Sequence, residues 1–140
     1  MSGSWLLVRA GARRVGLALT DVVEVLDSGP VYPVPSREPA VRGVTTVREG
    51  IMPLVHLGSL LDGTPCPERR GETTVLVRVD GRPLCLEVSD AEEVLSEAGH
   101  PVPAGATLPF AAAVARLPEG LVPLLDLTAL VARISETTSA

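Results

Sequence analysis

The chain has 140 residues, a mass of 14.6 kDa and a formal net charge of −5 at neutral pH. Its 46% hydrophobic and 21% charged residues fit one globular domain, and its acidic balance lacks the basic face that nucleic-acid binding needs. No apolar run approaches the ~20 residues of a membrane helix, and the N-terminus shows no signal-peptide pattern. We therefore expect a soluble, cytoplasmic protein without direct membrane insertion.

The first predicted elements are the two strands of a hairpin. Residues 5–9 and 15–19 are short apolar runs, and the Gly-Ala-Arg sequence at 11–13 between them is typical of a turn. Residues 21–26 follow with a spacing that suits either one helical turn or a strand, and both interpretations remain open. Prolines are dense over residues 30–39, which excludes helix and central strand and predicts an extended surface connection.

A second pair of strands completes the first half of the chain. Residues 41–47 and 51–57 flank a turn in which Gly50 supplies backbone freedom. Residues 58–61 have the leucine spacing of a helix. Residues 64–72 carry two prolines and four charges, and they predict an exposed link.

The same order of elements recurs in the second half. Residues 6–26 match residues 75–95 at a constant offset of 69, and residues 47–61 match residues 117–131 at an offset of 70. A repeat of this kind has to be recognised before the fold is predicted. In the first match the identical pairs are Leu7/Leu76, Val8/Val77, Arg9/Arg78, Arg13/Arg82, Leu17/Leu86, Asp21/Asp90, Glu24/Glu93, Val25/Val94 and Leu26/Leu95.

The second half adds turn and strand signals of its own. Asp80 and Gly81 stand between alternating apolar runs, which is the strongest short-range signal for a type I′ hairpin turn. In residues 84–88, Leu and Val alternate with Cys85 and Glu87, the pattern of a half-buried strand. The remaining elements repeat those of the first half: a proline-rich connection (101–109), two strands (111–117 and 121–127) and a helix (128–134).

Short strands at this spacing predict small β-barrels, and the duplication predicts two of them packed on each other. We assign one domain over residues 1–140, with halves at about 5–63 and 73–134. Residues 64–72 form the link, and residues 135–140 are expected to be a frayed tail.

Few residues could carry catalysis. His56 lies in an apolar strand, and its counterpart in the second half is Asp126, which favours a structural hydrogen-bonding site over half of a catalytic dyad. Cys66 and Cys85 lack metal-ligand spacing and a basic neighbour that would lower their pKa, so we interpret them as reduced thiols, with Cys85 as a small buried hydrophobe. No glycine-rich phosphate loop is present. The sequence therefore disfavours an enzyme.

Three ordered motifs carry a resemblance to a known family. Residues 39–57, PAVRGVTTVREGIMPLVHL, resemble the central motif of the CheW-like domain, which runs approximately P-x-x-x-x-G-V-x-N-L-R-G-x-x-x-P-V-x-D-L. Residues 16–25, GLALTDVVEV, are similar to the family's earlier A-L-P-I…V-x-E-V block, and residues 84–94, LCLEVSDAEEV, to its G-L-x-V-D-x-V-x-x-V block. The likeness extends from Trp5 to about Val131.

This resemblance implies a mainly β fold: two five-stranded SH3-like β-barrels related by a pseudo-twofold duplication, with short helical segments and a shared hydrophobic seam. It implies a non-enzymatic adaptor, without cofactor or metal, that couples chemoreceptors to a CheA-type histidine kinase in a bacterial chemosensory pathway. In the family, the cytoplasmic tips of methyl-accepting receptors dock in the groove between the barrels, and the kinase's regulatory domain docks barrel against barrel. The location would then be cytoplasmic, clustered with receptors or in a cytoplasmic array.

The resemblance also assigns protein-binding residues. Glu24 and Arg48 match the Glu of V-x-E-V and the Arg of N-L-R-G, which places them on the partner-binding face, close enough to pair with one another. Val22 and Leu26 beside them form either an exposed apolar strip or part of the core. The full set of residues assigned to protein binding is Val22, Glu24, Leu26, Gly43, Thr46, Arg48 and Glu49.

Several positions depart from the family pattern. Gly43 keeps the family glycine, where a close backbone approach is expected, but Thr46 stands in place of Asn and Glu49 in place of Gly. The other departures are His56 for Asp, Cys85 for Gly and Ser89 for Asp. A charge at the hairpin tip supports an alternative: a divergent adaptor that keeps receptor binding and loses kinase coupling.

An alternative of another class also remains. In this hypothesis the chain is a small-molecule or metal-responsive β-barrel protein that uses His56, His100 and the two thiols.

Overall fold

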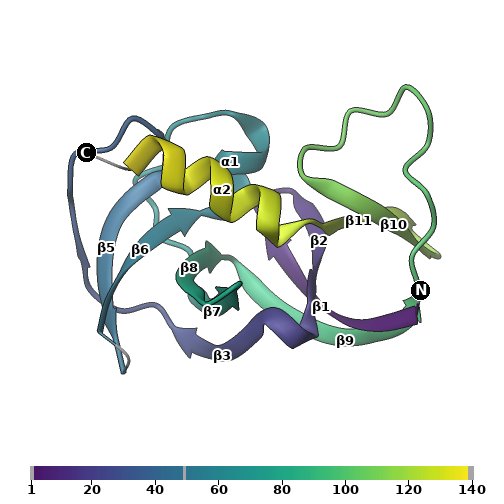
Figure 1. The fold of residues 1–140 in the computed structure, drawn as a ribbon, viewed down its shortest axis with the longest axis horizontal. Helices are drawn as coiled ribbons and strands as arrows, with labels where there is room; N and C mark the ends of the chain where they lie inside the picture. The colour runs from purple at the N-terminus through teal and green to yellow at the C-terminus, as the bar shows by residue number, and fades with distance from the viewer. Residues whose placement is uncertain (1, 49, 139–140) are drawn as a thin grey trace.

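Two small β-barrels lie side by side, and the C-terminal helix crosses from one to the other (Figure 1). The computed structural model describes residues 2–48 and 50–138. No helix in these residues is long and apolar enough to cross a membrane. The strands and helices are β1 (Ser2–Ala10), β2 (Arg13–Ala18), the 3-10 turn η1 (Leu19–Asp21), β3 (Val22–Asp27), β4 (Val31–Tyr32), β5 (Val41–Val47), β6 (Gly50–His56), α1 (Leu57–Asp62), β7 (Thr73–Val79), β8 (Arg82–Val88), β9 (Asp90–Ala98), β10 (Ala111–Leu117), β11 (Gly120–Leu125) and α2 (Leu127–Thr138).

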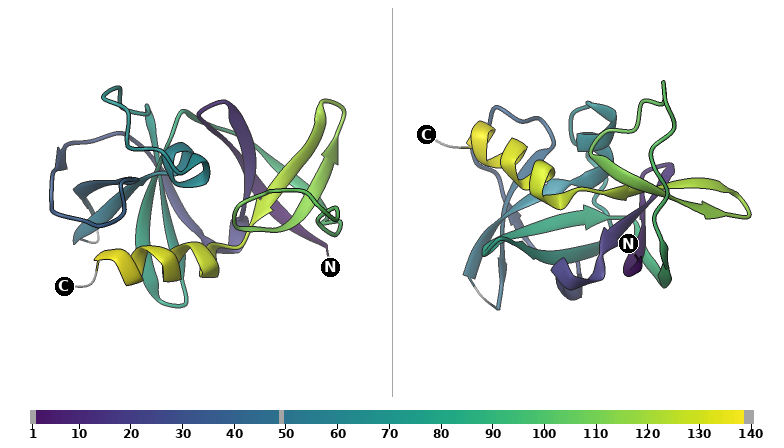
Figure 2. Two further views of the ribbon diagram at one scale, coloured as in Figure 1. Left: turned by 90° about the horizontal axis from the view of Figure 1, so that it is seen from above. Right: turned by 45° about the vertical axis from the view of Figure 1, so that its right-hand side comes forward.

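Each barrel is built from both halves of the chain. One sheet has the strand order β3-β7-β8-β6-β5-β4, and we call it the first barrel because most of its strands come from the first half. The other, the second barrel, has the order β10-β11-β2-β1-β9. The hairpins β1–β2 and β7–β8 are therefore exchanged between the halves. Figure 2 shows the N-terminal hairpin beside β9, β10 and β11. The sequence predicted two similar halves but not this exchange.

The strand registers repeat at the predicted offset. Val25 pairs with Val75 in the first barrel, and the equivalent residues Val94 and Leu6 pair in the second. The parallel pairs β6–β8 and β11–β2 are equivalent in the same way, with Leu54 opposite Cys85 and Leu124 opposite Gly16. Reciprocal pairing of this kind is what an approximate twofold axis produces. The prediction that residues 6–26 and 75–95 occupy equivalent places is confirmed.

Three hydrophobic clusters make up the core. The largest lies between the barrels and joins side chains of β1, β2, β7 and β8 with both helices, so the shared seam is present. Each barrel also has a small cluster of its own, built around Leu54 and Leu76 in the first and around Leu7 and Leu124 in the second. Because Leu7 and Leu124 are the counterparts of Leu76 and Leu54, the duplication extends to the packing.

Local signals in the sequence account for the turns. Asp80 and Gly81 have φ angles of 50° and 80°, as a type I′ turn requires. Gly50 and Gly120 both have φ near 130°, a value that favours glycine, at equivalent hairpin positions. The segment over 21–26, for which helix and strand were both open, is a strand, β3, from Val22 onward, while Asp21 ends the 3-10 turn η1.

Two other expectations differ from the structure. β8 is buried on both faces, including Cys85 and Glu87 with 0% exposure, and is not a half-buried strand. It lies between β7 and β6 and is covered by the central cluster on one side and the first barrel's own cluster on the other. Helix α2 continues to Thr138, beyond the predicted start of a frayed tail at residue 135.

Candidate protein-binding site

Glu24 and Arg48 form the ion pair that the sequence predicted. Glu24 lies on β3, and Arg48 follows the end of β5, with 2.9 Å between Arg48 Nη2 and Glu24 Oε2. The Arg48 side chain is 82% exposed and that of Glu24 28%. Because water screens a pair of this kind, it adds under about 1 kcal/mol to stability. The pair is thus available to a partner at little cost to the fold.

Arg48 also lines a surface depression between β3 and β5, which we call the β3–β5 groove. It has a volume of about 400 Å³. Thr45, one of its lining residues, donates from Oγ1 to the carbonyl oxygen of Pro30 at 2.7 Å, which links β5 to the segment that follows β3. Its lining residues are Leu26, Asp27, Gly29, Thr45, Thr46, Val47, Arg48 and Thr74.

Three of the predicted site residues line the groove, Leu26, Thr46 and Arg48, and Glu24 contacts Arg48 through the ion pair. It lies within the first barrel, between β3 and β5, and not between the two barrels as expected. A second depression, of about 340 Å³, does lie between the barrels, where β3 and β7 meet the start of β9. Leu26 lines both depressions.

The exposed apolar side chains of β3 are not those of Val22 and Leu26, for which an exposed strip and the core were both open. Val22 packs against the central cluster and Leu26 is half-buried, whereas Val23 and Val25 are 46% and 45% exposed. On β9, Val94, the counterpart of Val25, is 53% exposed. The run VVEVL offers apolar residues on both faces of a strand, so only the packing of Val22 on the core decides which of them face solvent.

Gly43 is a structural residue at this site. A Cβ built on it would lie 2.3 Å from the carbonyl oxygen of Tyr32, on the neighbouring strand β4 that pairs with β5 at this point. This confirms the predicted close backbone approach. Thr46 is exposed on the groove wall, and Glu49 lies outside the described residues.

His56 caps helix α1, as its counterpart Asp126 caps helix α2. The Nδ1 atom of His56 accepts from the backbone N–H of Ser59 at 3.1 Å, and Asp126 Oδ1 accepts from that of Ala129 at 3.2 Å. The structural role predicted for this pair of positions is confirmed. Burial lowers the pKa of His56, although Glu87 acts in the opposite direction.

A pH dependence follows from this cap. Since the pKa of His56 is lower in the folded state than in the unfolded chain, its contribution to stability is complete above about pH 6.5 and is lost as the pH falls below that value. We expect His56→Asp to keep the cap, which is worth about 0.5–2 kcal/mol, and to weaken the loss of stability between pH 7 and pH 5. Urea denaturation at several pH values measures this, and identical pH profiles for both proteins would contradict it.

The two thiols are not arranged as a site. Cys85 is buried in the first barrel, and burial raises its pKa to about 11. Cys66 Sγ donates to the carbonyl oxygen of Ala40 at 3.2 Å, and burial also raises its pKa. Within residues 2–48 and 50–138, no three His, Cys, Asp or Glu side chains are grouped in a way that could hold a metal ion.

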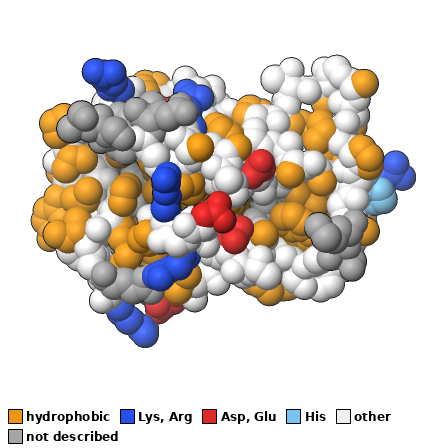
Figure 3. Space-filling model, viewed as in Figure 1, with side chains coloured by type: hydrophobic (Ala, Val, Ile, Leu, Met, Phe, Trp, Pro, Cys, Tyr) orange, Lys and Arg blue, Asp and Glu red, His pale blue; other side chains and the backbone are white. Residues whose placement is uncertain are grey.

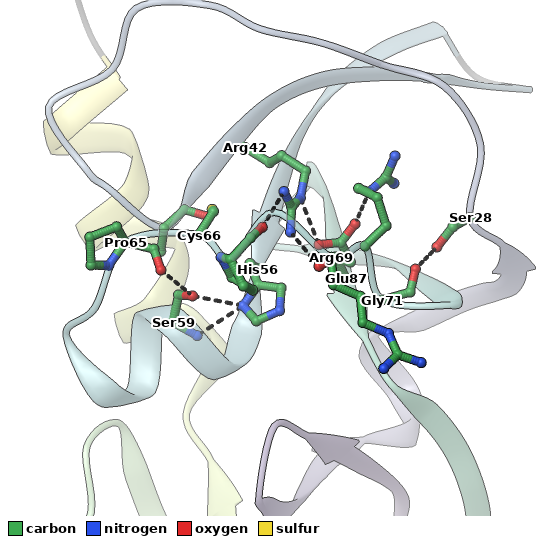
Figure 4. Close-up of polar contacts among 12 residues, drawn as sticks. Ser28, Arg42, His56, Ser59, Pro65, Cys66, Arg69, Gly71 and Glu87 are labelled. Carbon is green, nitrogen blue, oxygen red and sulfur yellow. Dashed lines mark hydrogen bonds and ion pairs between the residues drawn. The ribbon is translucent and has the colours of Figure 1, made fainter.

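A buried charge network behind the groove was missed by the sequence analysis (Figure 4). Glu87, with no exposure, accepts from Arg42 Nε at 2.8 Å through Oε1 and from Arg70 Nε through Oε2. Arg42 Nη1 also donates to the carbonyl oxygen of Pro67 at 2.8 Å. The link over 64–72 is thus fixed to the barrel and is not simply an exposed connection. A glutamate inside the apolar run of β8 was the available signal.

The second barrel carries a different charge cluster. Arg14 on β2 contacts three carboxylates, with 2.8 Å from its Nε to Glu92 Oε1, 3.5 Å from its Nη2 to Glu93 Oε1, and a contact from its Nη1 to Glu119. The hydrogen bond from Arg14 lowers the pKa of Glu92. This cluster lies at the surface and ties β9 and the β10–β11 turn to β2.

The exposed apolar residues are not confined to β3. Figure 3 shows hydrophobic side chains gathered over β5 and β6. Ile51 on β6 is 71% exposed, and its counterpart Leu121 on β11 is 50% exposed. Each barrel therefore presents an apolar side chain directly after its turn glycine.

Comparison with known proteins agrees with the resemblance that the sequence motifs indicated. The family model of the CheW-like domain matches residues 4–135. The solved structure of the scaffolding protein TtCheW from Thermoanaerobacter tengcongensis is similar to this chain, with a TM-score of 0.77 and 19% identity over 91% of this chain and 86% of the other. No curated protein matches the chain.

Proposed function

Because the chain belongs to the CheW-like domain family, we propose that it couples chemoreceptors to a CheA-type histidine kinase in a bacterial chemosensory pathway. Members of this family are non-enzymatic scaffold proteins of chemotaxis, and this chain is accordingly an adaptor and not an enzyme. Two SH3-like β-barrels form its fold. Adaptors of this kind act by mutual binding, which needs exposed surfaces and no catalytic group.

The surface around β3 supports receptor binding best. Val23, Val25 and Val94 are exposed apolar side chains on β3 and β9, the strands that flank the depression between the barrels. The Glu24–Arg48 pair and the β3–β5 groove lie beside them. An apolar strip next to an ion pair suits the side of a helical receptor tip, since apolar anchors supply affinity and charges supply register. This observation carries the proposal.

The exposed residues after the turn glycines support kinase binding. Ile51 and Leu121 occupy equivalent places in the two barrels. A regulatory domain of the same fold would meet either of them barrel against barrel. His56 and Cys85, two of the departures from the family pattern, have internal roles, so neither weighs against such a contact.

Arg48→Ala tests the receptor side of the proposal. We expect it to lower affinity for a receptor-tip peptide about tenfold, as loss of a charged anchor does, while stability changes by under about 1 kcal/mol because the pair is exposed. Titration calorimetry and thermal unfolding on one sample give both values. Arg116→Ala, at an exposed site on the second barrel, is the control. A large loss of stability with unchanged affinity would assign Arg48 to folding.

The divergent alternative is decided by the same assay. Titration against both the receptor tip and the kinase regulatory domain from the same genome shows which partner is bound. Binding to both supports coupling, whereas binding to the receptor alone supports an adaptor that has lost the kinase. Glu49→Gly then tests whether the charge at this position is the cause.

A further inference from the structure

We propose that buried Glu87 is a positioning residue that sets the width of the β3–β5 groove by holding its two walls through Arg42 and Arg70. The effect on groove geometry follows from the contacts alone, whereas its effect on partner binding rests on the proposed function. Both arginines approach the same carboxylate, one at each oxygen. In Figure 4 the Glu87 carboxylate and Arg42 point toward one another.

Arg42 fixes the β5 wall. It lies on β5, three residues before Thr45, where the groove lining begins. The Arg42 side chain is 11% exposed, and all three of its nitrogens have acceptors: Nε bonds Glu87, Nη1 the Pro67 carbonyl and Nη2 the Arg69 carbonyl at 3.3 Å. A planar guanidinium bound at every nitrogen has little freedom to move. The strand that carries it is therefore held relative to β8.

Arg70 fixes the β3 wall. Its Nε bonds Glu87, and its Nη1 donates to the carbonyl oxygen of Gly29 at 3.1 Å. Gly29 itself lines the groove. The preceding Ser28 adds two contacts, because its Oγ donates to the Gly71 carbonyl and its N–H donates to the Glu72 carbonyl at 3.1 Å. The end of β3 is thus attached to the link, and the link is attached to Glu87.

The link has no room to move closer to β8. A Cβ on Gly71 would lie 2.5 Å from the carbonyl oxygen of Val88 and 2.9 Å from Cγ of Glu87. A carboxylate without solvent is stable only when its charge is paired. Removing either arginine leaves Glu87 with one partner, and water or a shift of the link has to replace the other. The walls would then separate.

Among the described residues, the second barrel has no equivalent of the Arg42–Glu87–Arg70 network. The counterparts of Glu87 and Arg42 are Ala18 and Ala112. There the corresponding strands, β9 and β10, are joined by a hydrogen bond from the backbone N–H of Arg116 to Glu97 Oε1 at 3.3 Å, which is an exposed contact. We call the Arg42–Glu87–Arg70 network the brace. It is a feature of the first barrel that the second barrel, as far as the structure describes it, does not share.

Hydrogen exchange tests the geometry without any partner. In Arg70→Met, which keeps an unbranched apolar stem and removes the guanidinium, we expect amides of β3 and of residues 44–48 to exchange roughly tenfold faster, as loss of a charge-assisted hydrogen bond predicts. Amides of β10 and β11 should be unchanged. Arg14→Met is the matched control, and it should affect β9 and the β10–β11 turn instead. Unchanged exchange in β3 and β5, or a uniform increase throughout the protein, would overturn the proposal.

Glu87→Gln and the receptor titration complete the test. Glu87→Gln keeps the shape of the side chain, and faster exchange confined to the same two walls would support the proposal. Should that variant fail to fold, Arg42→Lys, which keeps the charge but loses two nitrogens, replaces it with the same expectation. Weaker receptor-tip binding by Arg70→Met supports both proposals. Faster exchange with unchanged receptor affinity would support the brace and contradict receptor docking in the groove.

Discussion

Replacing Leu130 with alanine is expected to lower the free energy of unfolding by about 2–5 kcal/mol, the usual cost of a leucine-to-alanine cavity in a closed core. Leu130 lies on α2 with no exposure, in the central cluster that joins the two barrels. Its neighbours come from strands that are fixed in two sheets, so the cavity cannot collapse easily. The loss should appear in urea denaturation as a lower midpoint with an unchanged slope.

Thr128→Ala is the control for this experiment, because Thr128 is on the same helix and exposed. We expect it to change stability by no more than about 0.5 kcal/mol. A loss below about 1 kcal/mol in Leu130→Ala would mean that α2 is not part of the cooperative unit. Two separate unfolding transitions would mean that the helix does not couple the barrels.

Gly43→Ala is expected to be the most damaging single-atom addition in the groove region. Gly43 has a φ of 152°, and the added Cβ would meet the backbone carbonyl of Tyr32 at 2.3 Å. Backbone strain costs about 1–3 kcal/mol, and the overlap adds about 1–3 kcal/mol, since a backbone carbonyl cannot rotate away as a side chain can. β4 should separate from β5, and amides of residues 44 and 45 should exchange faster.

Gly29→Ala is the matched control. Gly29 is in the neighbouring loop, and a Cβ there meets no atom within 4 Å. It should leave the melting temperature within about 2 °C of the unmodified protein. Equal melting temperatures for Gly43→Ala and Gly29→Ala would show that β4 yields without cost.

Local features of this fold were predictable from sequence, and long-range ones were predictable only where the resemblance supplied them. The Asp80-Gly81 turn needs two adjacent residues, and the Glu24–Arg48 pair followed from the family motifs. The Glu87 network joins residues 45 and 17 positions apart, with no local pattern to connect them.

The exchange of hairpins could not be predicted from the sequence for a different reason. β1 and β7 share Leu, Val and Arg at three successive equivalent places (7–9 and 76–78), so β3 finds a similar pairing partner in either. A hydrophobic pattern cannot distinguish pairing within a half from pairing between halves when the two hairpins are alike. The location of the groove could not be predicted for the same reason. Its lining on β3 and β5 belongs to the first half of the chain, whereas Thr74, which also lines it, belongs to the second half.

The exchange of hairpins also affects how the chain folds during its synthesis. One edge of β1 pairs with β2 and the other with β9, so the second edge stays unpaired at Leu6 and Val8 until Val94 and Ala91 have been synthesised. At 5–20 residues per second this delay is on the order of 5–20 s. Apolar strand edges that wait this long are exposed to wrong partners, including the same hairpin of a neighbouring nascent chain. Loop closure over such a distance also slows folding after release. We therefore expect the nascent chain to need protection by chaperones more than the small size of the protein suggests.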